Sequence, residues 1–103
     1  MERNELNRIW ESQEKELSEV KDVVDFFNVE VLEIKRDQYL SEGKWITKGY
    51  TFVTGTGGPH VEFTSNYLIC VYWGGDQMEF TTDDRQARGT IDQLEELINE
   101  INP

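Results

Sequence analysis

Hydrophobic residues in the first quarter of the chain recur at alternating steps of four and three, which is the spacing of one face of an α-helix. Only Gln13 interrupts the series, and Ile9 and Val23 widen the hydrophobic face. The series consists of Leu6, Trp10, Leu17, Val20, Val24 and Phe27. This pattern predicts an amphipathic helix over about residues 3–27.

The length of this helix conflicts with the size of a small sheet. About 26 helical residues span roughly 39 Å, whereas a strand of seven or eight residues spans only about 25 Å. Either the helix breaks, with Ser12 or Ser18 as break points and Ser18 as a cap of a second helix, or its first half overhangs the sheet. In the second case Leu6, Ile9 and Trp10 lack an intramolecular partner, and the helix would contact another protein or form a homodimer.

Residues 29–82 have the composition of β-strands. Val29–Lys35 is the first predicted strand, Arg36–Gly43 is a polar connection that includes Tyr39 and Leu40, and Lys44–Thr54 is the second strand. Alternation within the second strand places Ile46, Tyr50 and Phe52 on one side and Trp45 and Val53 on the other.

The remaining strands are separated by short turns. In order, the pattern predicts a turn at Gly55–Pro59, a strand at His60–Phe63, a bulge or turn at Thr64–Asn66, a strand at Tyr67–Trp73, a two-residue turn at Gly74-Gly75 and a last strand at Asp76–Thr82. Short connections favour antiparallel neighbours, so we expect a meander of four or five strands.

A second amphipathic helix is predicted over about residues 90–101, with Thr90 as its N-cap and Gln93 completing a capping box. Its hydrophobic face comprises Ile91, Leu94, Leu97, Ile98 and Ile101. The 103 residues therefore predict a single α+β domain, a two-layer sandwich with the N-terminal and C-terminal helices on one face of an antiparallel sheet.

The charge of the chain is strongly unbalanced. It carries 21 acidic and 10 basic residues, a net charge of −11, and it has no Lys or Arg between Gly49 and Asp84 or between Gly89 and Pro103. Such a charge repels nucleic acid and anionic membranes and attracts basic surfaces and cations. We therefore expect a basic protein partner, with no direct nucleic-acid binding and no membrane binding.

Cysteine content and apolar runs bear on location. Cys70 is the single cysteine, so no internal disulfide can form, which suits a reducing compartment. The longest apolar run, Tyr67–Trp73, is too short for a membrane helix, and the charged stretch Met1–Trp10 is unlike a signal peptide. We expect a cytoplasmic protein of prokaryotic origin.

The sequence contains no convincing catalytic arrangement. His60 follows a turn and Cys70 lies within a hydrophobic strand, so we interpret both as structural residues. The glycines of Gly55–Pro59 resemble a phosphate-binding loop, but a strand follows them and no lysine lies near, which favours a hairpin turn. We expect no enzyme, no catalytic residue and no cofactor.

Two sets of charged residues remain as candidate binding sites. Carboxylates near the predicted sheet edge form a weak candidate site for a divalent cation: Asp76, Glu79, Asp83 and Asp84. Arg85 and Arg88 precede the predicted N-terminus of the last helix at Thr90, and together they form a candidate anion site.

The function that these features favour is a non-enzymatic interaction or inhibitor module that presents carboxylates and exposed aromatic residues to a basic partner. The predicted partner-binding residues are Leu6, Ile9, Trp10, Glu62, Trp73, Asp76 and Glu79. The alternative is a domain that binds a small ligand or a divalent cation.

The order of elements, an acidic first helix followed by a meander sheet and a last helix, is similar to the frataxin-like arrangement. That resemblance implies weak iron binding along acidic edges. It is a likeness of element order, because Arg3, Arg8, Lys15 and Lys21 interrupt the acidic residues of the first helix. Small acidic α+β domains are also common among toxin-immunity proteins and phage inhibitors, which accords with an inhibitor module.

Overall fold

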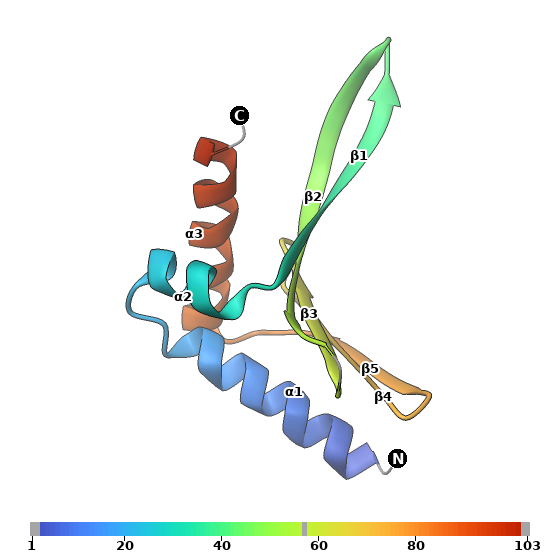
Figure 1. Ribbon diagram of the computed structural model, residues 1–103, viewed down its shortest axis with the longest axis vertical. Coiled ribbons are helices and arrows are strands. Elements are labelled where there is room, and N and C mark those ends of the chain that lie inside the picture. Colours follow the sequence, from blue (N-terminus) through green and yellow to red (C-terminus); the bar gives the residue numbers. More distant parts are fainter. Residues whose placement is uncertain (1–2, 57, 102–103) are drawn as a thin grey trace.

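The computed structural model describes residues 3–56 and 58–101. Its elements are α1 (Arg3–Ser18), α2 (Val23–Glu30), β1 (Glu33–Ser41), β2 (Lys44–Gly55), β3 (His60–Thr64), β4 (Leu68–Trp73), β5 (Asp76–Thr81) and α3 (Arg85–Ile101). The five strands form one antiparallel meander in the order β1-β2-β3-β4-β5, and the helices lie on one side of it (Figure 1). The predicted α+β architecture is confirmed.

Of the two alternatives left open for residues 3–27, the structure shows the broken helix, because α1 ends at Ser18. The Ser18 hydroxyl donates to the carbonyl of Lys15 at 2.7 Å, at the last turn of α1. A new helix then starts at Val23, where the Asp22 carboxylate accepts a hydrogen bond from the Asp25 amide. Ser18 is thus a break point, as predicted, but Asp22 provides the cap of the second helix.

The predicted start of the first strand at Val29 is wrong, since α2 continues to Glu30. The first strand starts at Glu33 and runs to Ser41, through most of the predicted polar connection Arg36–Gly43. The sequence prediction ended the first strand at Lys35, because the outer half of β1 is exposed on both faces and so lacks hydrophobic alternation.

Two tight turns set the register of the hairpins. Glu42 and Gly43 join β1 to β2 with φ of 52° and 78°, and Gly74 and Gly75 join β4 to β5 with φ of 60° and 86°. Positive φ at both central residues is the type I′ turn, whose twist matches that of paired strands. The predicted turn at Gly74-Gly75 is confirmed.

The other predicted connections can also be placed. β2 ends at Gly55 and β3 starts at His60, while Gly57 of the predicted turn lies outside the described residues. Between β3 and β4 the open choice between a bulge and a turn resolves as a turn, in which the Thr64 hydroxyl accepts from the amides of Asn66 and Leu68.

A β-bulge in β2 reverses the predicted faces of its outer half. Lys48 is the extra residue, because Asp37 pairs with Gly49 and Gln38 pairs with Thr47. Beyond this bulge, Tyr39 lies opposite Ile46, and Leu40 lies opposite Trp45. Directly opposed residues share a face, so Trp45 lies on the side of Tyr50 and Phe52, and Ile46 on the side of Val53, the opposite of the prediction.

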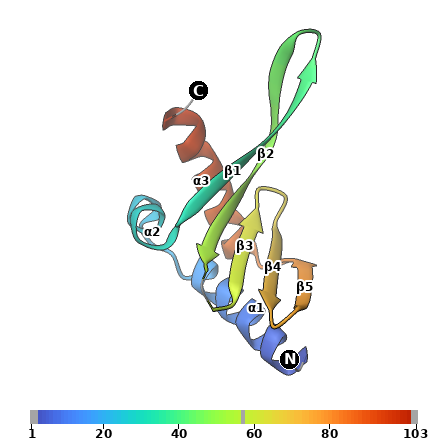
Figure 2. The ribbon, with the colours of Figure 1, turned by 45° about the vertical axis from the view of Figure 1, so that its right-hand side comes forward.

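The main core lies between the sheet and the three helices (Figure 2). Its fully buried side chains include Phe52, Phe63 and Ile69 from the sheet and Leu17, Ile91 and Leu94 from the helices. The rings of Phe52 and Phe63 stack across β2 and β3 with centroids 5.2 Å apart. Burial of this apolar area is the main force that holds the two layers together.

The first half of α1 packs within the molecule. Leu6 is only 3% exposed and contacts Val71 and Met78 of the sheet. The indole Nε1 of Trp10 donates to the carbonyls of Ile69 at 3.0 Å and of Phe80 at 3.3 Å. Because the helix breaks, the alternative in which Leu6 and Trp10 lack an intramolecular partner does not arise, and α1 lies along β4 and β5.

The last helix starts earlier than predicted. It begins at Arg85, and the Asp84 carboxylate accepts a hydrogen bond from the Ala87 amide at 2.9 Å, as an N-cap does. Thr90, the predicted cap, lies within the helix, where its buried hydroxyl donates to the carbonyl of Leu17 at 2.7 Å. This bond joins α3 to the end of α1.

The outer part of the β1–β2 hairpin projects away from the rest of the fold (Figure 1). From Lys35 to Lys48 every residue except Ser41 is exposed, and we call this segment the arm. It makes the molecule elongated, at 46 × 31 × 25 Å, with a radius of gyration of 14.2 Å. A compact domain of about 100 residues has a radius of gyration of about 13 Å.

Candidate functional site

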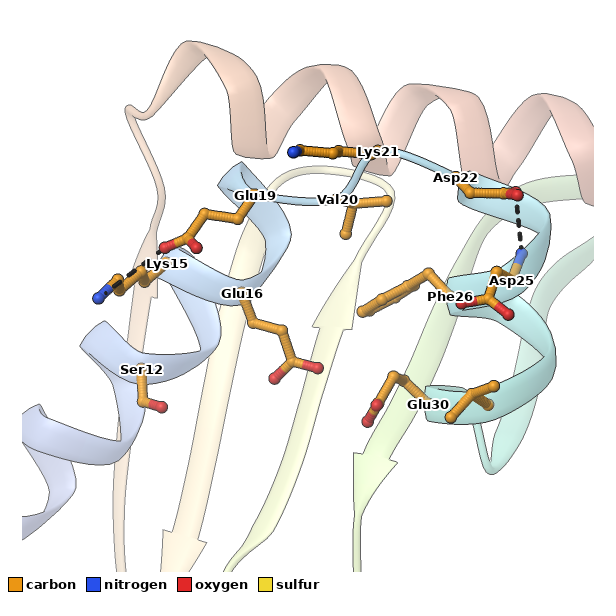
Figure 3. Close-up of a pocket in the computed structure, with 11 residues that line it drawn as sticks. Ser12, Lys15, Glu16, Glu19, Val20, Lys21, Asp22, Asp25, Phe26 and Glu30 are labelled. Atoms are coloured by element: carbon orange, nitrogen blue, oxygen red, sulfur yellow. Dashed lines mark hydrogen bonds and ion pairs between the residues drawn. The ribbon is translucent and has the colours of Figure 1, made fainter.

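A cleft of about 590 Å³ separates α1 from α2 (Figure 3). Its lining residues are Ser12, Lys15, Glu16, Glu19, Val20 and Lys21 from α1 and the turn, followed by Asp22, Asp25, Phe26, Val29 and Glu30. Within each helix they recur every three or four residues, so each helix contributes a single face. The segment between Ser18 and Val23 joins the two helices that flank the cleft (Figure 3).

The cleft combines apolar surface with negative charge. Phe26 is buried at its base, while Val29 is 64% exposed. Around them stand five carboxylates and two ammonium groups, from Glu16, Glu19, Asp22, Asp25, Glu30, Lys15 and Lys21. Its lining therefore carries a net charge of −3, and in the close-up Glu16 and Glu30 project into the space beside Phe26 (Figure 3).

Little of this negative charge is neutralised within the cleft. Lys15 and Glu19 approach to 3.9 Å, but both side chains are exposed, and such pairs contribute little energy. Burial raises the pKa of Glu16, and the nearby charge and hydrogen bond of Glu30 raise it further. The charge of Glu30 thus disfavours ionisation of Glu16, and a positively charged side chain placed between them would relieve that repulsion.

The exposed face of α3 is a second acidic surface. Asp92, Glu95, Glu96 and Glu100 follow Arg88 with no Lys or Arg among them. Within the described residues none of the four takes part in an ion pair, although Asp92 accepts a hydrogen bond from the Tyr67 hydroxyl at 2.8 Å. None of these four residues lines the cleft between α1 and α2.

The arm differs chemically from the rest of the molecule. It exposes four large apolar side chains near its end, Tyr39 (49%), Leu40 (61%), Trp45 (67%) and Ile46 (40%). It also holds four of the ten basic residues and only two of the 21 acidic ones, which gives it a charge of +2 and leaves −13 for all other residues. The sequence prediction had placed Tyr39 and Leu40 in a loop. Gly43, which readily adopts the positive φ of a type I′ turn, was the signal that could have revealed the hairpin, whereas Glu42 is not a residue that such turns favour.

His60 and Cys70 lie on the face of the sheet opposite the helices. His60 Nε2 and Glu62 Oε1 are 3.1 Å apart, and the Tyr72 hydroxyl donates to Glu79 at 3.0 Å. Cys70 is buried, and burial, with the charges of Glu79 and Glu62, raises its pKa to about 11. A thiol with that pKa is almost wholly protonated at neutral pH, so it is a poor nucleophile.

The four carboxylates predicted as a cation site do not converge. Glu79 accepts a hydrogen bond from Tyr72, Asp83 pairs with Arg88 at 3.3 Å, and Asp84 caps α3. No group of three or more His, Cys, Asp or Glu residues that could hold a metal ion occurs in the described part of the chain.

The predicted anion site loses its geometric basis. It relied on a helix N-terminus at Thr90, but α3 begins at Arg85. The Arg88 side chain is already engaged: its Nε donates to the Thr82 carbonyl at 2.7 Å, and its guanidinium lies 4.6 Å from the centre of the Tyr67 ring.

The predicted partner-binding residues are spread over different parts of the molecule. Leu6 and Trp10 belong to the core region described above, with Ile9 half-buried beside them. Trp73 and Asp76 border a shallow depression of about 380 Å³ at the β4–β5 turn. The structure thus does not bring these residues together, and the cleft between α1 and α2 was missed because it depends on how the two helices are oriented.

Comparisons with protein-family models, with curated proteins and with solved structures gave no match. Across the described residues, no helix is sufficiently long and apolar to span a membrane.

Proposed function

We propose that this protein is a non-enzymatic interaction or inhibitor module, and that its cleft between α1 and α2 binds a basic segment of a protein partner. The observation that carries this proposal is the combination of five carboxylates with the apolar surface of Phe26 and Val29 in one cleft. Carboxylates steer and orient a basic ligand, whereas an apolar floor provides the contact area that gives affinity.

The surroundings of the cleft support the same ligand class. The molecule outside the arm has a charge of −13, so a basic segment would be attracted from a distance before it reaches the cleft. The pKa of Glu16 is raised by burial first and by Glu30 second, and a bound Lys or Arg would reduce the repulsion from Glu30. An anionic ligand would be repelled by the charge of −13 and would add to the repulsion on Glu16.

Fluorescence anisotropy with a labelled Lys-Lys-Trp-Lys-Lys peptide tests the proposal. We expect binding that weakens steeply between about 20 mM and about 500 mM salt, since screening shortens the range of the attraction. A double substitution in the cleft, Asp25→Asn with Glu30→Gln, should abolish most of the binding. The matched control, Glu96→Gln with Glu100→Gln, removes the same charge from α3 and should leave most of it.

Two outcomes would contradict the proposal. One is the absence of salt-sensitive binding by the unaltered protein. The other is an equal loss of affinity in the cleft variant and the α3 variant, which would mean that net charge alone attracts the peptide.

The alternative drawn from the sequence, a domain that binds a small ligand or a divalent cation, can be measured in parallel. Melting curves with and without Ca²⁺ or Mg²⁺ report any ligand that binds only the folded state. Because the predicted carboxylates do not converge, we expect no shift of the melting temperature. We also propose a cytoplasmic location, which suits a protein whose single thiol, Cys70, is buried and reduced.

A further inference from the structure

The arm is an exposed β-hairpin whose side chains do not contribute to the hydrophobic core. A two-stranded ribbon without a covered face is only marginally stable in water, yet this one exposes four large apolar side chains at its end. Exposed apolar surface of this kind marks interaction sites, and Trp and Tyr are the residues most enriched among interface anchors. The chemistry of the arm therefore indicates that another surface covers it.

The arm has the chemistry of the ligand proposed for the cleft, a basic protein segment. Leu40 and Trp45 oppose each other on one face of the ribbon. Lys44 directly precedes Trp45, and Lys48 follows it three residues later at the bulge. The end of the arm is thus a basic segment with a projecting aromatic residue.

The arm of one molecule does not reach its own cleft. In both ribbon views it extends away from the end of the fold where α1 meets α2 (Figures 1 and 2). Any contact between the arm and such a cleft therefore has to be made between two molecules.

We propose that the partner is a second copy of this chain, whose arm enters the cleft between α1 and α2. This inference rests on the proposed function of the cleft and names the occupant. Trp45 and Leu40 would lie against Phe26 and Val29, while the lysines of the arm would lie beside the cleft carboxylates. The charges are opposite in sign, at +2 for the arm and −3 for the cleft lining.

Reciprocal exchange of two arms produces a closed dimer, because each molecule supplies one arm and one cleft. It also covers the apolar residues on the Leu40–Trp45 face of both arms. An anionic membrane is a less suitable occupant for the same arm, since the charge of −13 on the rest of the molecule would be repelled by it.

Sedimentation velocity over a range of protein concentrations and salt tests the inference. We expect the unaltered protein to dimerise at low salt and to dissociate as salt is added. Trp45→Ala should raise the dimer dissociation constant by about tenfold or more, as expected for loss of an aromatic anchor. Ile101→Ala, which removes another exposed apolar side chain, is the matched control and should leave the dimer intact.

Mixing two defective variants distinguishes this dimer from other kinds. Trp45→Ala damages only the arm, and Val29→Asp damages only the cleft; both residues are exposed, so both variants should keep the melting temperature of the unaltered protein. Each alone should be monomeric. Their mixture should form a heterodimer, because one intact arm still finds one intact cleft.

Several results would overturn the inference. They are a monomer at all concentrations, a dimer that survives Trp45→Ala, a mixture that stays monomeric while the unaltered protein dimerises, or Trp45-dependent sedimentation with phosphatidylglycerol vesicles in place of dimerisation. If the protein is monomeric but its cleft still binds the Lys-Lys-Trp-Lys-Lys peptide, the second copy is excluded and the proposed function stands. If it does neither, both proposals fail.

Discussion

Glu16 shows how one residue reports on the cleft. It lies on the face of α1 that looks toward α2, and its pKa is raised by burial first and by Glu30 second. A carboxyl group with a raised pKa in the folded state favours folding while it is protonated. That contribution is present below its ordinary pKa of 4.5 and is lost as pH rises through the folded-state value.

Replacing this carboxyl group should therefore stabilise the protein at neutral pH. We expect Glu16→Gln to raise the melting temperature at pH 7, because the amide removes a partly buried charge and its repulsion with Glu30. Below pH 4.5 we expect no such effect. Thermal unfolding followed by circular dichroism at several pH values measures this. Glu11→Gln, an exposed change elsewhere on α1, is the control; an equal gain in both variants would show that lower net charge is the cause.

At the scale of elements, the junction between α1 and α3 holds the helical layer together. The hydroxyl of Thr90, in the middle of α3, donates to the carbonyl of Leu17 near the end of α1, and both residues are buried. This contact fixes where α1 ends, and so it positions one wall of the cleft. The bond can form because Thr90 lies within α3, where its hydroxyl reaches α1.

Thr90→Val should remove this bond while keeping the shape of the side chain. The Leu17 carbonyl would be left buried without its partner, at a cost of about 1 kcal/mol in the free energy of unfolding. Urea unfolding measures the difference, with the exposed Thr81→Val as a control that should change stability by less than about 0.5 kcal/mol. An unchanged midpoint for Thr90→Val would mean that the bond contributes nothing.

The same scale shows which elements the sequence could predict. The strands β2, β3, β4 and β5 and the hydrophobic face of α3 follow from alternation and helical spacing, which depend on local burial. The arm has both faces in water, so its strand β1 carries no such pattern. The start of α3 was missed because Asp84 lies in a polar stretch where several residues are plausible caps.

At the scale of the whole molecule, the charge is divided between two regions. The arm carries +2 and all other residues carry −13, although the sequence shows only an acidic chain until the arm is recognised as a separate projection. The cleft could not be predicted either, because it arises from the angle between α1 and α2. That angle depends on the turn at residues 19–22, whose path is set by tertiary packing rather than by residue pattern.

The location of peptide binding tests the central claim most directly. Amide chemical shifts of the ¹⁵N-labelled protein, recorded while Lys-Lys-Trp-Lys-Lys is added at low salt, report which residues the peptide contacts. We predict changes concentrated in residues 12–30, on the facing sides of α1 and α2, and smaller changes along α3. Changes that centre on the acidic face of α3, or that spread evenly over the surface, would contradict a binding cleft between α1 and α2.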